Sequence, residues 1–84
     1  MTTEDFRREL QDVLSAAQAK GLQSVEIGAG SLHERVGGYP GRDHRMPLCC
    51  NVMRKAMQPG DEVVAGPPGG AGASLKIRYR LPRQ

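Results

Sequence analysis

Apolar and charged residues alternate strictly near the end of the chain, over residues 75–81. The apolar positions are Leu75, Ile77, Tyr79 and Leu81, and the positions between them are Lys76, Arg78 and Arg80. A period of two is typical of a strand that buries one face and exposes the other. The pattern therefore predicts a strand with an apolar inner face and a cationic outer face.

An earlier stretch carries apolar residues at helical spacing. It starts at Thr2 or Thr3, either of which can cap a helix, and Gly21 is suited to end it. Its apolar positions are Phe6, Leu10, Val13, Leu14 and Ala17. The spacing predicts an amphipathic helix, and we expect Leu22 to pack just beyond its end.

A second helical pattern runs from Pro47 to Gln58. Pro47 suits the first turn, where its missing N–H is not needed, and Pro59-Gly60 ends the pattern. The apolar stripe consists of Leu48, Cys49, Val52, Met53 and Ala56. The outer face carries Asn51, Arg54, Lys55 and Gln58. We expect Cys50, at the edge of the stripe, to be partly exposed.

Shorter elements fill the rest of the chain. A strand is predicted over Ser24–Ile27, a short helix over Ser31–Val36 and a further strand over Asp61–Ala65. The stretch Gly66–Ser74 contains only Gly, Pro, Ala and Ser, which indicates a hairpin tip. The order of elements is therefore helix, strand, helix, helix, strand, strand.

This order is that of a winged helix, an α+β fold in which three helices pack on a small antiparallel sheet. We expect residues 1–84 to form one such domain, because the chain is too short for two. The terminal hairpin, about residues 61–81, would be the wing. The apolar face of its last strand would meet Val25 and Ile27 beneath the helices.

The composition bears on the core of the protein and on the compartment in which it is found. The chain has one Phe, two Tyr and no Trp, so aliphatic residues and Met must fill the core. No run of about 18 apolar residues is present, so we expect no membrane span. The start, MTTEDFRREL, has acidic residues where a signal peptide needs basic ones, which predicts a cytoplasmic protein. Cys49 and Cys50 are neighbours and cannot join distant parts of the fold.

Charge is distributed unevenly along the chain. The net charge is +3. Residues 1–32 contain five acidic and three basic residues, whereas residues 33–84 contain four and nine, so the two parts carry −2 and +5. An excess of cations in one part indicates an anionic partner for that part.

The basic helix and the basic strand together suggest a surface that binds double-stranded DNA. In a helix-turn-helix protein the second helix approaches base edges, where Asn pairs with adenine and Arg with guanine. Cations of the wing would contact phosphates and so position the protein. We expect the two segments to converge into one footprint. The residues expected to contact DNA are Arg42, His44, Arg45, Asn51, Arg54, Lys55, Gln58, Lys76, Arg78 and Arg80.

The chain resembles a winged helix-turn-helix domain over nearly its whole length. More narrowly, AGSLHERVGGYPGRDHRMPLCCNVMRKAM and GASLKIRYRLPR resemble small bacterial modules found alone or beside HNH-type endonucleases in restriction-like systems. The resemblance implies a DNA-associated domain that is regulatory or accessory to a DNA-processing system. The stretch Gly37–Met46 is longer than the usual turn of about three to four residues, which implies a different placement of the next helix.

Several motifs for bound groups are incomplete. GPPGGAGAS lacks the GK[ST] ending of a phosphate-binding loop, and GAGSLH has His33 where a dinucleotide fingerprint needs its third glycine. The side chains that could be considered as zinc ligands are His33, His44, Cys49 and Cys50. Cys49 and Cys50, however, are adjacent on a helix and would point about 100° apart, so they would not converge on one ion. We therefore expect no cofactor and no metal, and we expect His33 at the surface or boundary.

Catalysis is not expected of this chain either. His44 and Asn51 hint at an HNH nuclease, but no acid–histidine pair follows them. The main alternative to DNA binding is a protein-interaction module that uses the same surfaces, with Tyr39, Met46 and Met57 as adaptable contacts. An enzyme subunit would need a catalytic partner. The oligomeric state and the DNA target are left open.

Overall fold

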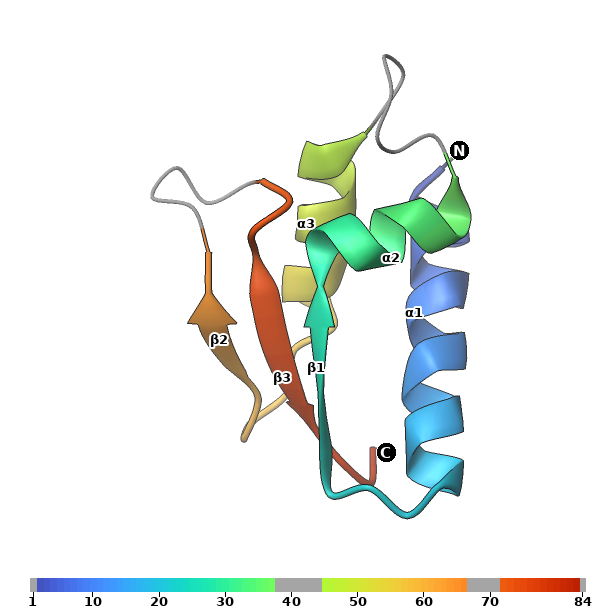
Figure 1. Ribbon diagram of the computed structural model, residues 1–84, viewed down its shortest axis with the longest axis vertical. Helices are drawn as coiled ribbons and strands as arrows, with labels where there is room; N and C mark the ends of the chain where they lie inside the picture. The colour runs from blue at the N-terminus through green and yellow to red at the C-terminus, as the bar shows by residue number, and fades with distance from the viewer. Residues whose placement is uncertain (1, 38–44, 67–71, 84) are drawn as a thin grey trace.

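Three helices alternate with three strands in the order expected from the sequence (Figure 1). The computed structural model describes residues 2–37, 45–66 and 72–83. The elements are α1 (Thr3–Ala19), β1 (Ser24–Gly28), α2 (Ala29–Val36), α3 (Met46–Lys55), β2 (Glu62–Ala65) and β3 (Lys76–Arg80). The expected α+β class is therefore confirmed.

The strands form one antiparallel sheet with β3 in the centre, in the order β1-β3-β2. In the register, Ile77 of β3 lies opposite Ile27 of β1 on one side and Val63 of β2 on the other. The pairing of β2 with β3 is irregular between Val63 and Ala65. The last strand thus joins the other two, although one of them lies about fifty residues earlier in the chain.

The alternation predicted for the last strand is confirmed. Leu75, Ile77, Tyr79 and Leu81 are all buried. The hydroxyl of Tyr79 donates a hydrogen bond to the backbone oxygen of Met53 at 2.8 Å, which joins β3 to α3. In Figure 1 α3 lies behind the sheet and α1 lies beside it. The core is therefore the space between the inner face of the sheet and the helices.

The first helix begins and ends where its residues predict. Thr2 caps it reciprocally: its backbone N–H donates to the Asp5 carboxylate at 2.8 Å, and its hydroxyl accepts from the Asp5 N–H at 3.3 Å. Gly21 follows with a φ of 81°, in the left-handed region that glycine tolerates. The expectation for Leu22 was wrong, because 47% of its surface is exposed.

The short helix starts two residues earlier than predicted. The backbone N–H of Ala29 donates to the oxygen of Leu75 at 2.8 Å, and that of Gly30 to the oxygen of Ala73 at 3.2 Å. These bonds satisfy amides that a helix start leaves without partners, so the helix can include Gly30. The first turn of α2 is thereby joined to the chain that leads into β3.

Helix α3 ends three residues before the predicted Gln58. The Gln58 N–H donates to the Asp61 carboxylate at 2.7 Å, and a residue before proline disfavours helical geometry. Cys50 is buried, with only 1% of its surface exposed, so its expected partial exposure was wrong. Its Sγ accepts from the N–H of Gly72 and donates to the oxygen of Gly72, both at 3.4 Å. The segment that leads into β3 therefore contacts this thiol at Gly72.

The placement of His33 also corrects the sequence interpretation, because this side chain is fully buried. Its Nε2 accepts a hydrogen bond from the backbone N–H of Arg45 at 2.7 Å. Its ring meets the edge of Phe6 with centroids 4.9 Å apart. This hydrogen bond satisfies Nε2, which lowers the cost of burying the ring.

Within the described residues, no helix combines the length and the apolar character that crossing a membrane requires.

Candidate nucleic-acid interface

The outer face of α3 exposes the polar residues that its spacing predicts. Asn51, Arg54 and Lys55 are exposed on the side of the helix opposite the buried Cys49 and Met53. Arg45 is exposed at the residue before α3, and Gln58 is exposed just after it. We call these five exposed residues the α3 face.

The α3 face contains no acidic side chain. No Asp or Glu occurs between residues 45 and 60 of the sequence, and the next carboxylate is that of Asp61. Among the described residues, no carboxylate oxygen lies within 4.0 Å of the Lys55 or Arg45 side chain. The face is therefore cationic in its own residues, and Lys55 and Arg45 have no carboxylate partner within the described part of the chain.

Arg83 and Asp61 form a separate, largely buried ion pair at the end of the sheet. The Arg83 guanidinium lies 2.9 Å from the Asp61 carboxylate, and their side chains are 10% and 1% exposed. It also donates to the oxygen of Ala56 at 2.6 Å and lies 5.1 Å from the centre of the Tyr79 ring. Arg83 therefore joins the segment after β3 to Asp61 and to the end of α3, and its guanidinium is too buried to belong to an anion-binding surface.

The environment of Asp61 favours its charged form. Burial by itself raises the pKa of this carboxyl, but backbone N–H groups of Arg80 and Gln58 and the guanidinium of Arg83 outweigh burial and lower the pKa. Burial raises the pKa of the neighbouring Tyr79 hydroxyl, which stays neutral as a donor.

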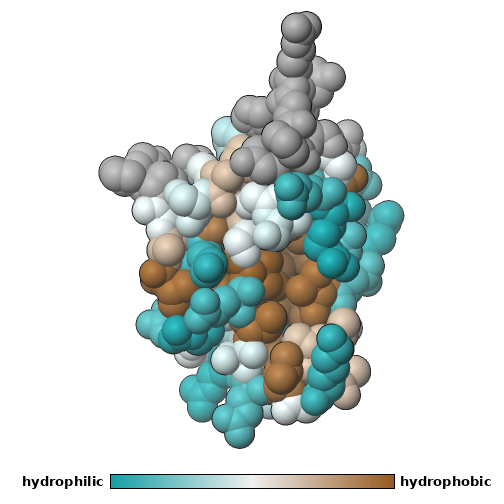
Figure 2. Space-filling model, in the orientation of Figure 1, coloured by the Kyte–Doolittle hydropathy of each residue, from teal (hydrophilic) through white to brown (hydrophobic). Residues whose placement is uncertain are grey.

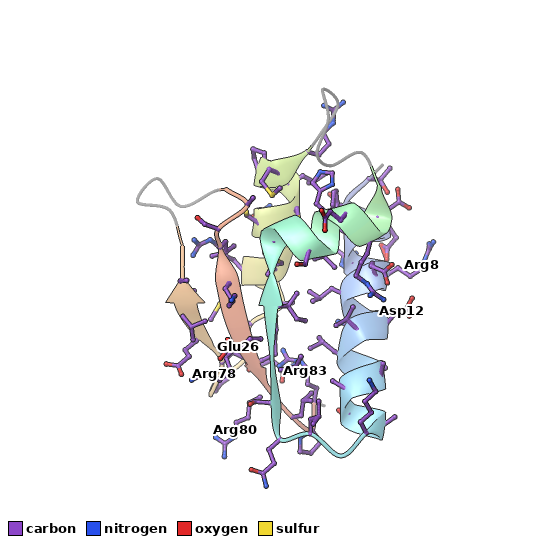
Figure 3. The ribbon with its side chains drawn as sticks, viewed as in Figure 1. Arg8, Asp12, Glu26, Arg78, Arg80 and Arg83 are labelled. Carbon is purple, nitrogen blue, oxygen red and sulfur yellow. The ribbon has the colours of Figure 1, made fainter. Side chains whose placement is uncertain are left out.

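The outer face of the sheet differs from the α3 face, because carboxylates flank its central cation. Glu26 of β1 and Glu62 of β2 lie opposite Arg78 in the register, and both form ion pairs with it, that with Glu26 at 3.0 Å (Figure 3). The hydrogen bond with Glu26 and the charges of both carboxylates raise the pKa of Arg78. Two carboxylates therefore compensate the charge of Arg78.

Lys76 and Arg80 lie on the same sheet face, on either side of Arg78 along β3. Figure 3 shows Arg80 pointing outward near the end of the sheet. Its aliphatic part lies against Gly60, where a Cβ atom would come within 3.0 Å of the Arg80 Cδ. Its φ of 100° favours glycine at this position, because other residues rarely adopt that conformation.

The structure does not bring the two basic segments into one footprint. Helix α3 packs on the inner face of the sheet, through its buried stripe and the bond between Tyr79 and Met53. Lys76, Arg78 and Arg80 alternate with the buried residues of β3 and so point the other way. Figure 2 shows the hydrophilic residues of the sheet face gathered over β2 and β3, whereas α3 lies behind (Figure 1).

One cation beside α3 was missed by the sequence interpretation. Arg7 of α1 lines a groove of about 270 Å³ between α1 and α3, and Lys55 and Asn51 line it from α3. The remaining lining residues are Thr3, Gln11, Val52 and Ala56. The sequence signal was available: Thr3, Arg7 and Gln11 are four residues apart and form one acid-free stripe on a helix. Which helix this stripe faces depends on tertiary packing.

The remaining residues predicted to contact DNA or a protein partner are either outside the described residues or at least partly buried. Arg42 and His44, together with Tyr39 of the alternative interaction surface, lie outside the described residues. Met46 is buried and Met57 is half-buried, so Met46 is unsuited to a surface contact. Among the residues that the structure describes, no three His, Cys, Asp or Glu side chains converge as metal ligands.

No protein-family model, no curated protein and no solved structure matches this chain.

Proposed function

We propose that this chain is a winged-helix domain that binds double-stranded DNA through the α3 face. The order α1-β1-α2-α3-β2-β3 with the sheet order β1-β3-β2 supports this proposal. In such a fold α2 and α3 form the helix-turn-helix, and α3 is the helix that reaches the groove of the duplex. The domain would then serve as a regulatory or accessory part of a DNA-processing system.

The single observation that carries the proposal is the contrast in charge between two faces. The α3 face presents cations with no carboxylate among them, whereas Arg78 on the sheet face is held between Glu26 and Glu62. A surface whose own residues include cations and no acids gains more by displacing counterions from phosphates than one whose central cation lies between two carboxylates. The proposal therefore assigns the primary contact to α3.

The residues of the α3 face divide into two roles. Asn51 lies at the centre of the exposed surface, where its amide can pair bidentately with adenine in the major groove. Arg45, Arg54 and Lys55 surround it and suit phosphates, with Arg54 also able to pair with guanine. Three phosphate contacts would contribute a slope of about −2.7 to the dependence of log affinity on log salt.

The test compares two double variants that remove the same charge. Arg54→Ala with Lys55→Ala should reduce the magnitude of the salt slope by about 1.8, because two phosphate contacts are lost. Lys76→Ala with Arg80→Ala removes two cations from the sheet face and should leave the slope close to that of the unmodified protein. Fluorescence anisotropy of a labelled duplex measures both, and thermal unfolding checks that both variants are folded.

Two results would contradict the proposal. One is an unmodified protein that does not bind duplex DNA even at low salt. The other is a sheet-face variant whose salt slope falls by as much as that of the α3 variant. If the α3 face instead binds an acidic protein and ignores duplex DNA, the chain is an interaction module that uses the same surface.

A further inference from the structure

We infer that the groove between α1 and α3 holds a segment of the DNA sugar–phosphate backbone, gripped by Arg7 from one wall and Lys55 from the other. The inference rests on the proposed DNA binding and extends it to α1, to which the sequence assigns no contact. The groove has a volume of about 270 Å³. Asn51 and Lys55 belong both to this groove and to the α3 face, so the two surfaces are continuous.

The walls of the groove are polar and its floor is apolar. Thr3, Arg7 and Gln11 present one wall from successive turns of α1, and all three are exposed. On the α3 side, Val52 is buried and Ala56 half-buried beneath the exposed Asn51 and Lys55. The wall side chains all carry hydrogen-bond donors. Donors above an apolar floor suit a phosphodiester, whose oxygens accept hydrogen bonds and whose sugar is largely apolar.

The charge of the groove selects an anion. None of the described residues that line it is acidic, whereas Arg7 and Lys55 are both cationic. The acidic residues Asp5, Glu9 and Asp12 of α1 instead line the opposite cleft, of about 560 Å³, toward the end of α2. The described residues that α1 contributes to the groove are therefore free of acids, whereas those that it contributes to the cleft toward α2 are largely acidic.

Arg7 is able to exchange its present partner for a phosphate. It pairs with Glu4 at 2.8 Å, but the two side chains are 55% and 59% exposed. Exposed pairs three residues apart on a helix contribute little to stability, so releasing this one costs little. A guanidinium can bind a phosphate through two parallel hydrogen bonds, so a phosphodiester can replace Glu4 as the partner of Arg7.

A matched pair of variants on α1 tests the inference. Arg7→Gln should lower the magnitude of the salt slope by about 0.9 and weaken binding uniformly across duplex sequences, as expected for a phosphate contact. Arg8→Gln removes the same charge from the next residue, which is also exposed but lines the cleft toward α2. Figure 3 shows Arg8 on the side of α1 away from the sheet. This control should keep the slope of the unmodified protein.

A third variant separates the groove from the ion pair. Arg7→Gln also leaves Glu4 uncompensated, and a free carboxylate would itself repel the duplex. Glu4→Gln removes that carboxylate and keeps Arg7, so it should bind at least as tightly as the unmodified protein. The double variant Glu4→Gln with Arg7→Gln should still show the slope lowered by about 0.9.

The outcomes distinguish this inference from the proposed function. If the Arg7 variants keep the full slope while Arg54→Ala with Lys55→Ala lowers it, the groove does not bind the backbone, although α3 does. If Arg8→Gln lowers the slope as much as Arg7→Gln, the effect is one of net charge and the inference is overturned. If the unmodified protein binds polyglutamate through Arg7 but no duplex, both the inference and the proposed function are wrong.

Discussion

His33 stabilises the start of α3 from inside the core. Its Nε2 accepts the N–H of Arg45, the residue before α3, and its ring packs edge-on to Phe6. The first amides of a helix have no partner within the helix, so an outside acceptor stabilises the start. A single side chain of α2 thus links α1, α2 and the beginning of α3.

Replacing His33 with Phe should be destabilising. Phe has a similar shape but no acceptor, so the N–H of Arg45 would lose its partner, at a cost of about 1–3 kcal/mol. Urea denaturation measures the loss. His33→Gln, which retains an acceptor at similar reach, should lose less stability. A His33→Phe protein as stable as the original would show that the bond to Arg45 contributes nothing.

The carboxylate of Asp61 links the segment after α3 to β3. It accepts from the N–H groups of Gln58 and Arg80 and pairs with Arg83. Asp61→Asn should lower the free energy of unfolding by about 3 kcal/mol near neutral pH, because the buried guanidinium of Arg83 would lose its counterion. Asp12→Asn, at an exposed position of α1, is the control and should change stability little.

The pH dependence of this loss has a definite sign. The pKa of Asp61 is lowered in the folded protein from the ordinary value of 3.8, so the folded state binds the proton less readily than the unfolded state. The stability that the charged carboxylate contributes is therefore complete above about pH 5 and declines as pH falls through the folded pKa. The difference between Asp61→Asn and the unmodified protein should shrink in acid. A difference that stays constant down to low pH would contradict this account.

At the scale of elements, β3 is the strand on which the sheet depends. It pairs with both other strands, and its inner face supplies Ile77 and Tyr79 to the core. Its outer face carries charges that meet carboxylates across the register. The two faces of this one strand therefore differ in what a substitution costs.

Two substitutions on adjacent residues of β3 should show this difference. Ile77→Asp places a carboxylate without a partner in the core and should abolish the cooperative unfolding transition. Arg78→Gln removes an exposed cation and should shift the transition only slightly, because exposed ion pairs contribute little. Circular dichroism during heating measures both. An Arg78→Gln protein that fails to fold would mean that the charged row holds the sheet together.

At the scale of the whole molecule, packing sorts the charges onto separate surfaces. None of the five residues of the α3 face is acidic, the sheet face is mixed, and Asp5, Glu9 and Asp12 of α1 line the cleft toward α2. A net charge of +3 describes none of these surfaces. An anionic partner is attracted by the local field, which is why we propose the α3 face and its groove as the surface for a duplex.

Periodicity and caps by themselves determined the elements of this protein. The structure confirms the alternation over residues 75–81, and of the two caps that the sequence allows, Thr2 and Thr3, it uses Thr2. Helical spacing also determined which residues of α3 belong to the candidate site. A helix that buries Cys49 and Met53 must expose Asn51 and Arg54 on its other side. Local geometry alone sets which side of a helix or a strand a residue occupies.

Tertiary structure alone decided what those sides face. It buried His33 against Phe6 and Cys50 against Gly72, placed two carboxylates beside Arg78, and put Arg7 next to α3. Each of these contacts joins elements whose relative placement depends on packing over the whole core. A period of two or of 3.6 carries no information about such partners, because Glu26 and Arg78 meet only when β1 and β3 pair across fifty-two residues of chain.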